Sequence, residues 1–341
     1  MNEKEFNEKL SNERQEIDRI DSQLLPLFVQ RMKCSQRVAA IKREAGAPVL
    51  NAQREREILD RVSQRACQLG GSPDFGHSAA ALYQAMLAIS RASQHCLLEQ
   101  NSPLAQLERT AKDALPNPIG RVVCQGVDGA YSHKAARRLF PGAEIQFVPE
   151  FKEVFSAVDS GALGVLPVEN SAAGSVTAVY DLILKYRFYI VGAVDISIEH
   201  CLCAPEGTAR QEITHVLSHP QALSQCSEFI FGSGLIPKEY SNTAAAAEYL
   251  SKQRPKATAA ICSLEAAERY GLQVLQRGVQ NEKNNTTRFI AISKEAVLPK
   301  DANKISLCFS LPHTTGSLYN VLQQFAAVGL SLTKIESRPI P

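Results

Sequence analysis

The first hundred residues carry hydrophobic positions at helical spacing. One row follows a seven-residue repeat and consists of Leu10, Ile17, Leu24 and Val38. A companion row consists of Ile20, Leu27, Cys34 and Ile41. Two such rows are typical of a long helix that packs in a bundle. The pattern therefore predicts helices over residues 3–100, with a local kink at Pro26, an end of the first helix near Gly46-Ala-Pro48, and a second helix capped by Asn51.

The rest of the chain changes pattern twice. Residues 101–118 contain three prolines and are expected to form a linker. Short apolar runs then alternate with helical patterns up to residue 294, which predicts an α/β domain over residues 119–297. A third unit begins at residue 303 and extends to 341, with a strand expected at 304–311, a helix at 316–327 and a second strand at 330–335. The predicted fold class is therefore multidomain, with an all-α unit over residues 1–100.

Composition narrows the function classes. The chain has 341 residues and a net charge of only +2, without a basic tail, so we expect no nucleic-acid partner. No apolar run approaches the roughly 20 residues that span a bilayer, and the polar N-terminus is no signal peptide, so no membrane association is expected. The nine cysteines are scattered and lack a Cys-x-x-Cys pair. This favours reduced thiols and a cytoplasmic location over disulfides or zinc, and we expect no cofactor.

Cations on the first helix suggest an anion site. Arg31 falls in the first apolar row, where a charge is costly unless it is paired. For a single residue, an arginine that snorkels to the surface or pairs with a carboxylate is the simpler explanation. Lys42 lies about 16 Å further along the same face, so the two side chains could converge on one small anion. Arg14 lies about 42 Å before Lys42 on an unbroken helix, so only a second protomer could bring it to the same ligand.

The second and third helices carry further polar residues that could contact a ligand. Arg54 and Glu55 fall in the first turn of the second helix, and Ser90 and Gln94 share one face of the third, which could also be an ordinary polar stripe. Residues 8–96 resemble the all-helical chorismate mutase family in the order and spacing of Arg14, Arg31, Lys42, Arg54, Glu55, Ser90 and Gln94. The resemblance implies an intertwined homodimer or higher homo-oligomer of three-helix chains, with Arg14 supplied by the partner and Asn51 in place of a more usual Asp.

That family rearranges chorismate, a dicarboxylate, to prephenate in a pericyclic step that needs no acid, base or nucleophile. Holding a compact conformer and stabilising charge on the breaking ether oxygen are what accelerate such a step. The resemblance implies that Lys42 and Gln94 donate to this oxygen. It also implies substrate contacts from Ser90, carboxylate contacts from the three arginines, and hydroxyl contacts from Asn51 and Glu55.

Two apolar runs in the α/β segment end in polar residues. The run Ala162–Val168 leads into Glu169-Asn-Ser171, and Asn285-Thr-Thr-Arg288 precedes the run Phe289–Ile292. Polar groups at the carboxyl edge of an open α/β sheet are where ligands bind. Hydroxyls and a guanidinium suit a small carboxylate-bearing substrate, although each stretch alone could equally be a solvated turn.

Further motifs in this segment resemble the prephenate dehydratase family over residues 119–294. They are Gly126–His133, Pro167–Ser171, Ser218–Gln221, Ser241–Ala246 and Thr286–Phe289. The resemblance implies a two-lobed fold like that of periplasmic binding proteins, with one lobe over 119–195 and 280–294 and the other over 196–275. Thr287 is the implied catalytic group. The other implied prephenate-binding residues are Ser132, Glu169, Asn170, Ser171, His219, Thr243 and Arg288. Arg288 could instead orient the loop or pair structurally, and a structural hydrogen bond would explain Glu169 and His219 equally well. Cys262 replaces a more usual Gly.

Residues 303–341 resemble the first half of an ACT domain, a ferredoxin-like module that binds amino acids. Gly316-Ser-Leu318 matches its strand-to-helix turn, and Glu336-Ser-Arg-Pro339 matches its phenylalanine-binding motif, with Glu336, Ser337 and Arg338 as implied effector contacts. Only a βαβ half of the module is expected here. Either the sequence is truncated or normal feedback by L-phenylalanine is absent.

The combined expectation is a bifunctional enzyme that converts chorismate to prephenate and prephenate to phenylpyruvate in phenylalanine synthesis. A mutase fused to prephenate dehydrogenase is disfavoured because no Gly-x-Gly-x-x-Gly follows a strand. A mutase fused to a non-catalytic amino-acid sensor is the remaining alternative, and Thr287 argues against it.

Overall fold

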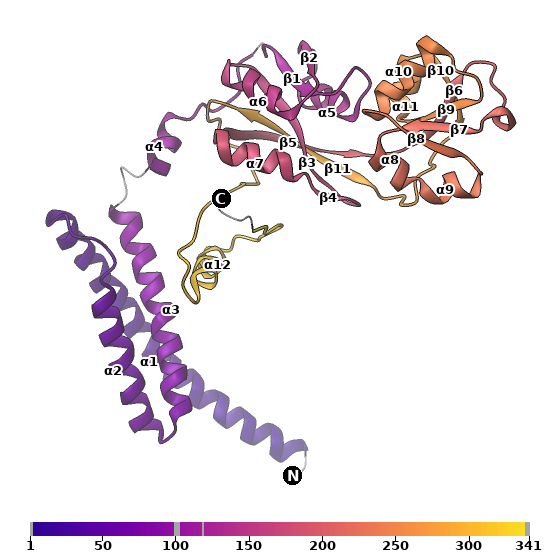
Figure 1. The fold of residues 1–341 in the computed structure, drawn as a ribbon. Helices are drawn as coiled ribbons and strands as arrows, with labels where there is room; N and C mark the ends of the chain where they lie inside the picture. The colour runs from indigo at the N-terminus through magenta and orange to yellow at the C-terminus, as the bar shows by residue number, and fades with distance from the viewer. Residues whose placement is uncertain (1–2, 99–102, 118, 338–341) are drawn as a thin grey trace. The chain divides into compact units, whose positions relative to one another are not determined.

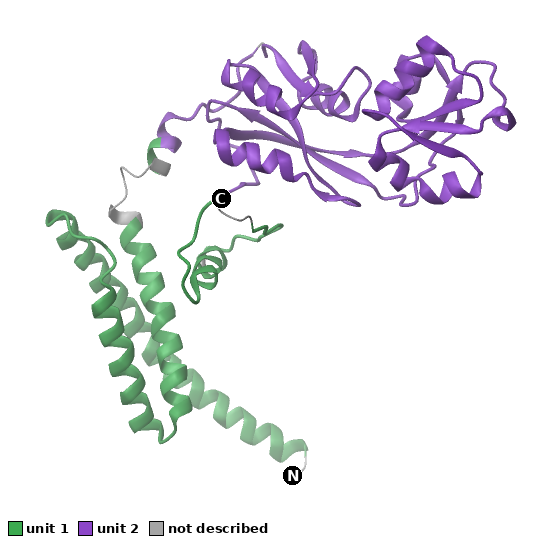
Figure 2. Ribbon diagram, viewed as in Figure 1, with its two compact units in different colours: residues 1–106, 309–341 green, residues 107–308 purple. Residues whose placement is uncertain are grey.

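The computed structural model describes residues 3–98, 103–117 and 119–337 (Figure 1). The chain divides into two compact units, residues 1–106 with 309–341 and residues 107–308 (Figure 2). No helix among the described residues is long and apolar enough to cross a membrane.

Three helices form most of the first unit: α1 (Glu3–Glu44), α2 (Ala52–Gly70) and α3 (Pro73–Leu98). α1 continues through Pro26, so the proline does not break the helix. The predicted cap of α2 is confirmed, because the side chain of Asn51 accepts a hydrogen bond from the backbone N–H of Arg54 at 3.0 Å. α2 ends at Gly70, and its C-cap Gly71 has a left-handed backbone (φ 70°) that turns the chain into α3.

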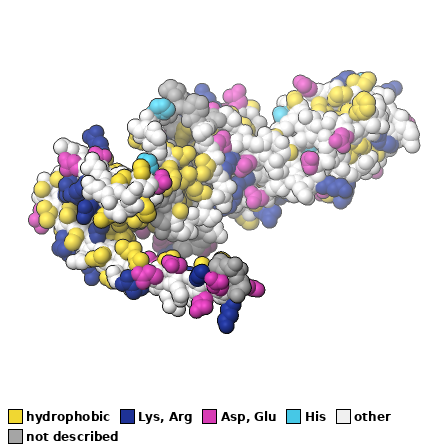
Figure 3. All heavy atoms as spheres, turned by 90° about the horizontal axis from the view of Figure 1, so that it is seen from below, with side chains coloured by type: hydrophobic (Ala, Val, Ile, Leu, Met, Phe, Trp, Pro, Cys, Tyr) yellow, Lys and Arg dark blue, Asp and Glu magenta, His cyan; other side chains and the backbone are white. Residues whose placement is uncertain are grey.

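The apolar rows of α1 are not buried within this chain. Hydrogen bonds tie the C-terminal half of α1 to α3, where Ala39 is fully buried. The N-terminal half extends beyond the other two helices (Figure 1). Hydrophobic side chains are consequently visible on the surface of the helical unit (Figure 3). Ile17, Leu24 and Ile41 remain 56%, 55% and 65% exposed. The expected burial of the rows therefore fails within one chain, because no described segment covers these positions of α1.

A six-stranded mixed sheet organises the first lobe of the second unit. Its strands are β1 (Val122–Gln125), β2 (Ile145–Val148), β3 (Leu163–Asn170), β4 (Gly174–Ser175), β5 (Tyr189–Ser197) and β11 (Thr286–Ser293), in the order β2-β1-β3-β11-β5, with β4 beside β3. β1, β2 and β3 are parallel, and β11 runs antiparallel to β3 and β5. One face packs on α5 (Tyr131–Leu139), and the other packs on α6 (Phe151–Asp159) and α7 (Thr177–Tyr186).

A five-stranded sheet organises the second lobe. Its strands are β6 (Cys201–Pro205), β7 (His215–Ser218), β8 (Ile236–Glu239), β9 (Thr258–Cys262) and β10 (Leu272–Gln276), in the order β10-β6-β9-β7-β8. The helices are α8 (Pro220–Gln225), α9 (Ser227–Gly232), α10 (Thr243–Gln253) and α11 (Leu264–Arg269), with a short 3-10 turn at Arg210–Glu212. α10 and α11 cover one face, and α8 and α9 cover the other.

Two crossing segments join the lobes, one between β5 and β6 and one between β10 and β11. They are hydrogen-bonded to each other, from Ile198 N–H to Asn285 O at 2.8 Å and from Val279 N–H to His200 O at 2.9 Å. The predicted two-lobed architecture is confirmed.

The segment expected to be a linker is partly built into the second unit. It contains α4 (Pro103–Thr110), and after this helix Lys112 pairs with Val297. Lys112 N–H donates to Ala296 O at 3.0 Å, Leu298 N–H donates to Lys112 O at 2.9 Å, and the Lys112 side chain forms an ion pair with Glu295. Leu115 and Ile119 then pack against the core of the first lobe. The chain thus enters and leaves the two lobes at one bridge.

The third unit is only partly as predicted. The helix forms as α12 (Ser317–Ala327), but residues 304–311 and 330–335 are not strands. These strand predictions are wrong because strands need hydrogen-bonding neighbours. In a split βαβ arrangement a further strand lies between the two, and the described residues supply none.

Candidate active sites

Asn170 anchors a buried polar cluster at the end of β3. Its Oδ1 accepts hydrogen bonds from the backbone N–H groups of Ala172 (3.1 Å) and Ala173 (2.9 Å). Backbone N–H groups only donate, so the oxygen must face them and the Nδ2 group must face the other way. Nδ2 then donates to Asn285 Oδ1 at 2.7 Å and to Thr287 Oγ1 at 2.8 Å. The antiparallel register explains the meeting, since Asn170 and Thr287 are Cα partners across β3 and β11.

This geometry decides how the Thr287 hydroxyl can act. Its oxygen already accepts the proton of Asn170 Nδ2, so its own proton is available to a different acceptor. Thr287 is 9% exposed and Asn170 is 6% exposed. A hydroxyl that is oriented in this way can donate to a leaving group without competition from Asn170.

Glu169 and Arg288 lie on the opposite face of the sheet. They are the next Cα pair in the register, and side chains alternate between the faces of a sheet. Arg288 Nε lies 3.7 Å from Asp195 Oδ1 on β5, which is an ion pair across neighbouring strands. The structure therefore separates these two predicted binding residues from the Thr287 hydroxyl.

Ser171 holds the turn that follows β3. Its Oγ accepts from the backbone N–H of Thr286 at 2.9 Å and donates to Asn284 O at 3.3 Å. Both partners lie at or just before the start of β11, so this hydroxyl ties the turn after Asn170 to the residues just before Thr287. Its side chain is committed to the backbone, unlike that of Thr287.

Two residues absent from the sequence prediction connect the second lobe to this cluster. Gln225, at the end of α8, donates from Nε2 to Asn170 Oδ1 at 3.4 Å, and its Oε1 lies 3.1 Å from His200 Nε2. His200 is buried in the first crossing segment, and burial lowers its pKa. Its Nδ1 has no hydrogen-bond partner among the described residues. Only the contact between the lobes brings Gln225 and His200 to Asn170, so no local sequence signal could have identified them.

The other predicted residues occupy the first turns of helices. Ser132 is buried in the first turn of α5 and Thr243 begins α10. His219 caps α8, where its Nδ1 accepts from Gln221 N–H at 3.2 Å. Burial lowers the pKa of His219, while Glu239 acts in the opposite direction. Because β7, β8 and β9 are parallel, α8, α10 and α11 all begin at one edge of the second sheet. Helix N-termini present N–H groups that suit carboxylates.

The helical unit brings together three of the predicted mutase residues, Arg31, Ser90 and Gln94. Arg31 Nη1 donates to Ser90 Oγ at 2.9 Å, and Gln94 Nε2 donates to Ser35 Oγ at 2.8 Å, so these side chains lie between α1 and α3. Gln94 Oε1 is buried without a partner in the described part of the chain. Rotating this amide would let the Ser35 hydroxyl donate to Oε1 and would free Nε2 to donate to a ligand.

The remaining predicted mutase residues have other contacts in the single chain. Lys42 Nζ donates to Val49 O, and Glu55 forms an ion pair with Arg91. Arg54 Nη1 lies 3.5 Å from Glu57, and the Asn51 side chain caps α2. Arg14 is exposed on the N-terminal half of α1, about 42 Å along the unbroken helix from Lys42. Within one chain, the structure thus does not bring Arg14 to the other predicted mutase residues.

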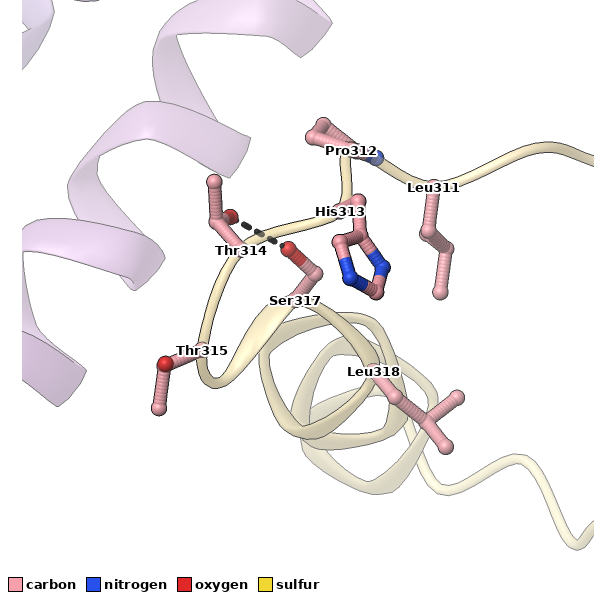
Figure 4. Close-up of a pocket in the computed structure, with 7 residues that line it drawn as sticks. All are labelled: Leu311, Pro312, His313, Thr314, Thr315, Ser317 and Leu318. Atoms are coloured by element: carbon pink, nitrogen blue, oxygen red, sulfur yellow. Dashed lines mark hydrogen bonds between the residues drawn. The ribbon is translucent and has the colours of Figure 1, made fainter.

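The predicted effector motif lies in a segment without strands. Glu336 lies 3.2 Å from Lys334, Ser337 is exposed, and Arg338 lies outside the described residues. A hollow of about 470 Å³ lies at the start of α12 (Figure 4). It is lined only by residues of the segment 311–318, in which Thr314 Oγ1 lies 2.7 Å from Ser317 Oγ. A hollow formed by one turn of chain does not supply the converging groups of a built ligand site.

Comparison with known proteins identifies both enzymatic regions. The family model of prephenate dehydratase matches residues 122–297, and that of chorismate mutase type II matches residues 13–95. Arogenate dehydratase/prephenate dehydratase 6 of Arabidopsis thaliana is 39% identical over 279 residues, which are 77% of this chain and 67% of that protein. Arogenate dehydratase 2 of Petunia hybrida is 42% identical over 64% of this chain, and the match spans 57% of that relative.

A solved structure adds agreement at the level of the fold. The prephenate dehydratase of Arthrobacter aurescens in complex with L-Phe is 29% identical, with a TM-score of 0.56. The match covers 64% of this chain and 76% of that one.

Proposed function

Because this chain belongs to the prephenate dehydratase family and carries a chorismate mutase type II domain before it, we propose that it converts chorismate to prephenate and prephenate to phenylpyruvate. The observation that carries the second step is the hydrogen bond from Asn170 Nδ2 to Thr287 Oγ1 at 2.8 Å. Both steps belong to phenylalanine biosynthesis.

Dehydration of prephenate releases carbon dioxide and water together. The electrons of the carboxylate bond move into the ring, and the ring hydroxyl leaves as it receives a proton, so the ring becomes aromatic. An enzyme promotes this step by donating a hydrogen bond or proton to the departing oxygen. Thr287 is suited to this role because Asn170 occupies its acceptor site and leaves its proton for the substrate. A threonine is a weak acid, so its contribution is a directed hydrogen bond coupled to a proton from water.

The substrate also brings two carboxylates, which need hydrogen-bond donors. The first turns of α5 and α10 supply backbone N–H groups near Ser132 and Thr243, and the His219 imidazole lies at the start of α8. We propose that these groups bind the carboxylates. Glu169 and Arg288, on the other face of the sheet, then contribute to the order of β3 and β11.

The mutase step rests on the groups between α1 and α3. We propose that Arg31 and Ser90 bind one carboxylate and that Gln94, after rotation of its amide, joins Lys42 at the ether oxygen. Stabilisation of charge at this oxygen requires only directed donors. The exposed apolar rows of α1 support a homodimer, because a partner helix would cover them and bring its Arg14 to the site.

Purified enzyme supplied with prephenate, and separately with arogenate, tests the dehydration step. Prephenate should yield phenylpyruvate at neutral pH without any acid treatment, whereas turnover of arogenate alone would reassign the substrate. Thr287→Val removes the hydroxyl at similar volume and should lower the dehydratase rate about 100-fold, the least expected for a proton-transfer group. Binding of prephenate without turnover by the unaltered enzyme would favour the non-catalytic sensor instead.

A further inference from the structure

The loop Gly126–Ala130, which connects β1 to α5 in the first lobe, lies against α11 of the second lobe. Ser263, the N-cap of α11, donates from Oγ to Gly129 O at 3.3 Å. Tyr270, just after α11, donates from its hydroxyl to Asp128 O at 2.8 Å. A Cβ at Gly129 would lie 3.1 Å from Ala266 Cα, so the two backbones are nearly in contact. This contact is separate from the crossing segments that join the lobes.

The Asp128 carboxylate joins the two lobes by a direct ion pair. Its Oδ2 lies 2.7 Å from Arg269 Nη2 at the end of α11. Its Oδ1 lies 2.9 Å from Nδ1 of His133, which belongs to α5 in the same lobe as Asp128. Lys134 of α5 forms a second interlobe ion pair with Glu265 of α11. One carboxylate thus contacts the opposite lobe and the helix that carries Ser132.

His133 has two competing partners at one nitrogen. Gly129 N–H donates to Nδ1 at 3.1 Å, which requires Nδ1 to be without a proton. A hydrogen bond to Asp128 Oδ1, by contrast, requires a proton on Nδ1. Protonation of the imidazole therefore exchanges a bond within the loop for a bond to the carboxylate that holds the other lobe.

We propose that Asp128 is a positioning residue of the dehydratase site, which clasps the two lobes through Arg269 and fixes the loop before Ser132 through His133. This inference rests on the proposed function, because the loop leads into the first turn of α5 that we assign to a substrate carboxylate. The clasp preorganises both lobes before substrate arrives, so its loss raises KM and leaves kcat nearly unchanged.

The groups around His133 give a second, activity-independent signature. Burial lowers the pKa of His133, Asp128 opposes this shift, and Arg137 and Arg269 reinforce it. The imidazole also contacts the ring of Phe147 on β2, whose centroid lies 5.1 Å away. The pKa of His133 should therefore fall in Asp128→Asn and rise in Arg269→Gln, as followed by NMR titration.

The central experiment is a double-mutant cycle on the full chain. Asp128→Asn and Arg269→Gln should each raise KM for prephenate about 2- to 5-fold, the range that a partly exposed ion pair supports, and the double variant should be no worse than Asp128→Asn alone. Asp159→Asn is the matched control, because it breaks an ion pair of 2.8 Å to Lys294 within the first lobe only. Hydrogen exchange of residues 126–134 and 263–270 should accelerate in the two single variants and not in the control.

Each outcome decides the matter. Additive losses in the double variant, a fall confined to kcat, or unchanged exchange would overturn the clasp. Recovery in Asp128→Glu, which keeps the charge, supports it, and failure of that variant together with unshifted His133 titrations overturns it. If the unaltered enzyme has no dehydratase activity, the proposed function fails, while hydrogen exchange and NMR still report on the clasp.

Discussion

Exchange of Asn170 for aspartate should reverse the direction of one hydrogen bond and disable the dehydratase step. The side chains are nearly isosteric, and the oxygen that accepts from Ala172 and Ala173 is retained. At Nδ2, however, a donor becomes an ionised acceptor that faces Thr287 Oγ1 at 2.8 Å. The Thr287 proton would then turn toward the carboxylate and away from the substrate.

The size of the loss follows from this competition. A hydrogen bond to a buried charged acceptor contributes about 1.5–3 kcal/mol, so withdrawing the Thr287 proton should slow turnover about 10- to 150-fold. The variant also loses the hydrogen bond that Asn170 Nδ2 donates to Asn285 Oδ1 at 2.7 Å, which should lower the stability of the fold. When the introduced carboxyl group is protonated it can donate to Thr287 again. Activity of the variant should therefore recover as pH falls through the pKa of that group, and the unaltered enzyme should show no such recovery.

The assay is the initial rate of phenylpyruvate formation from prephenate across a pH series, with folding checked by circular dichroism. Asn284→Asp is the matched control, because it places the same charge on an exposed neighbouring residue that does not bond to Thr287. An equal loss in the control, or a slow Asn170→Asp variant without recovery at low pH, would refute the assigned direction of the hydrogen bond.

Four further predictions address the rest of the chain. Mixing inactive Arg14→Ala with inactive Lys42→Ala subunits under exchange should restore part of the mutase activity, and verified heterodimers without recovery would argue against a shared site. Lys42→Ala should abolish prephenate formation but leave dehydration of added prephenate intact, whereas parallel loss in a folded protein would contradict separate sites. L-phenylalanine up to about 1 mM should barely change dehydratase activity, since residues 303–337 form one helix and no strand; saturable inhibition would show that an effector site assembles. Gly129→Ala should raise KM, because its Cβ would lie 3.1 Å from Ala266 Cα of the other lobe. Gly126→Ala is also at positive φ, but its Cβ would meet only Ala130 of the same loop, at 3.4 Å, so it should cost stability alone. Equal KM values in the two variants would count against contact between the lobes at this loop.

Local patterns predicted the elements of this protein better than the contacts between them. The helical spacing before residue 45 and the cap at Asn51 need only neighbouring residues, and both are confirmed. Asn170 and Thr287 could be placed at strand ends, because an apolar run beside polar residues marks such an end. Their opposition across β3 and β11 depends on register, which the sequence alone does not reveal.

What local patterns could not supply has equally specific causes. Glu169 and Arg288 stand beside Asn170 and Thr287 in the sequence, but strand alternation sends adjacent side chains to opposite faces. Gln225 and His200 join the cluster only because the two lobes meet. The strands beside α12 were inferred from apolar patterns, but a strand also requires a partner along its edge, and no described segment provides one.

The bridge between Lys112 and Val297 places the two ends of the two-lobed unit next to each other. A domain whose ends lie together can be inserted into a longer chain, or removed from it, without separating its own strands. Fusion to a helical domain on one side and to the α12 segment on the other therefore places no demand on the geometry of the lobes. The same arrangement implies that a fragment carrying the two lobes alone should begin before Lys112 and end after Leu298. A shorter fragment would lose the hydrogen bonds that join its two ends.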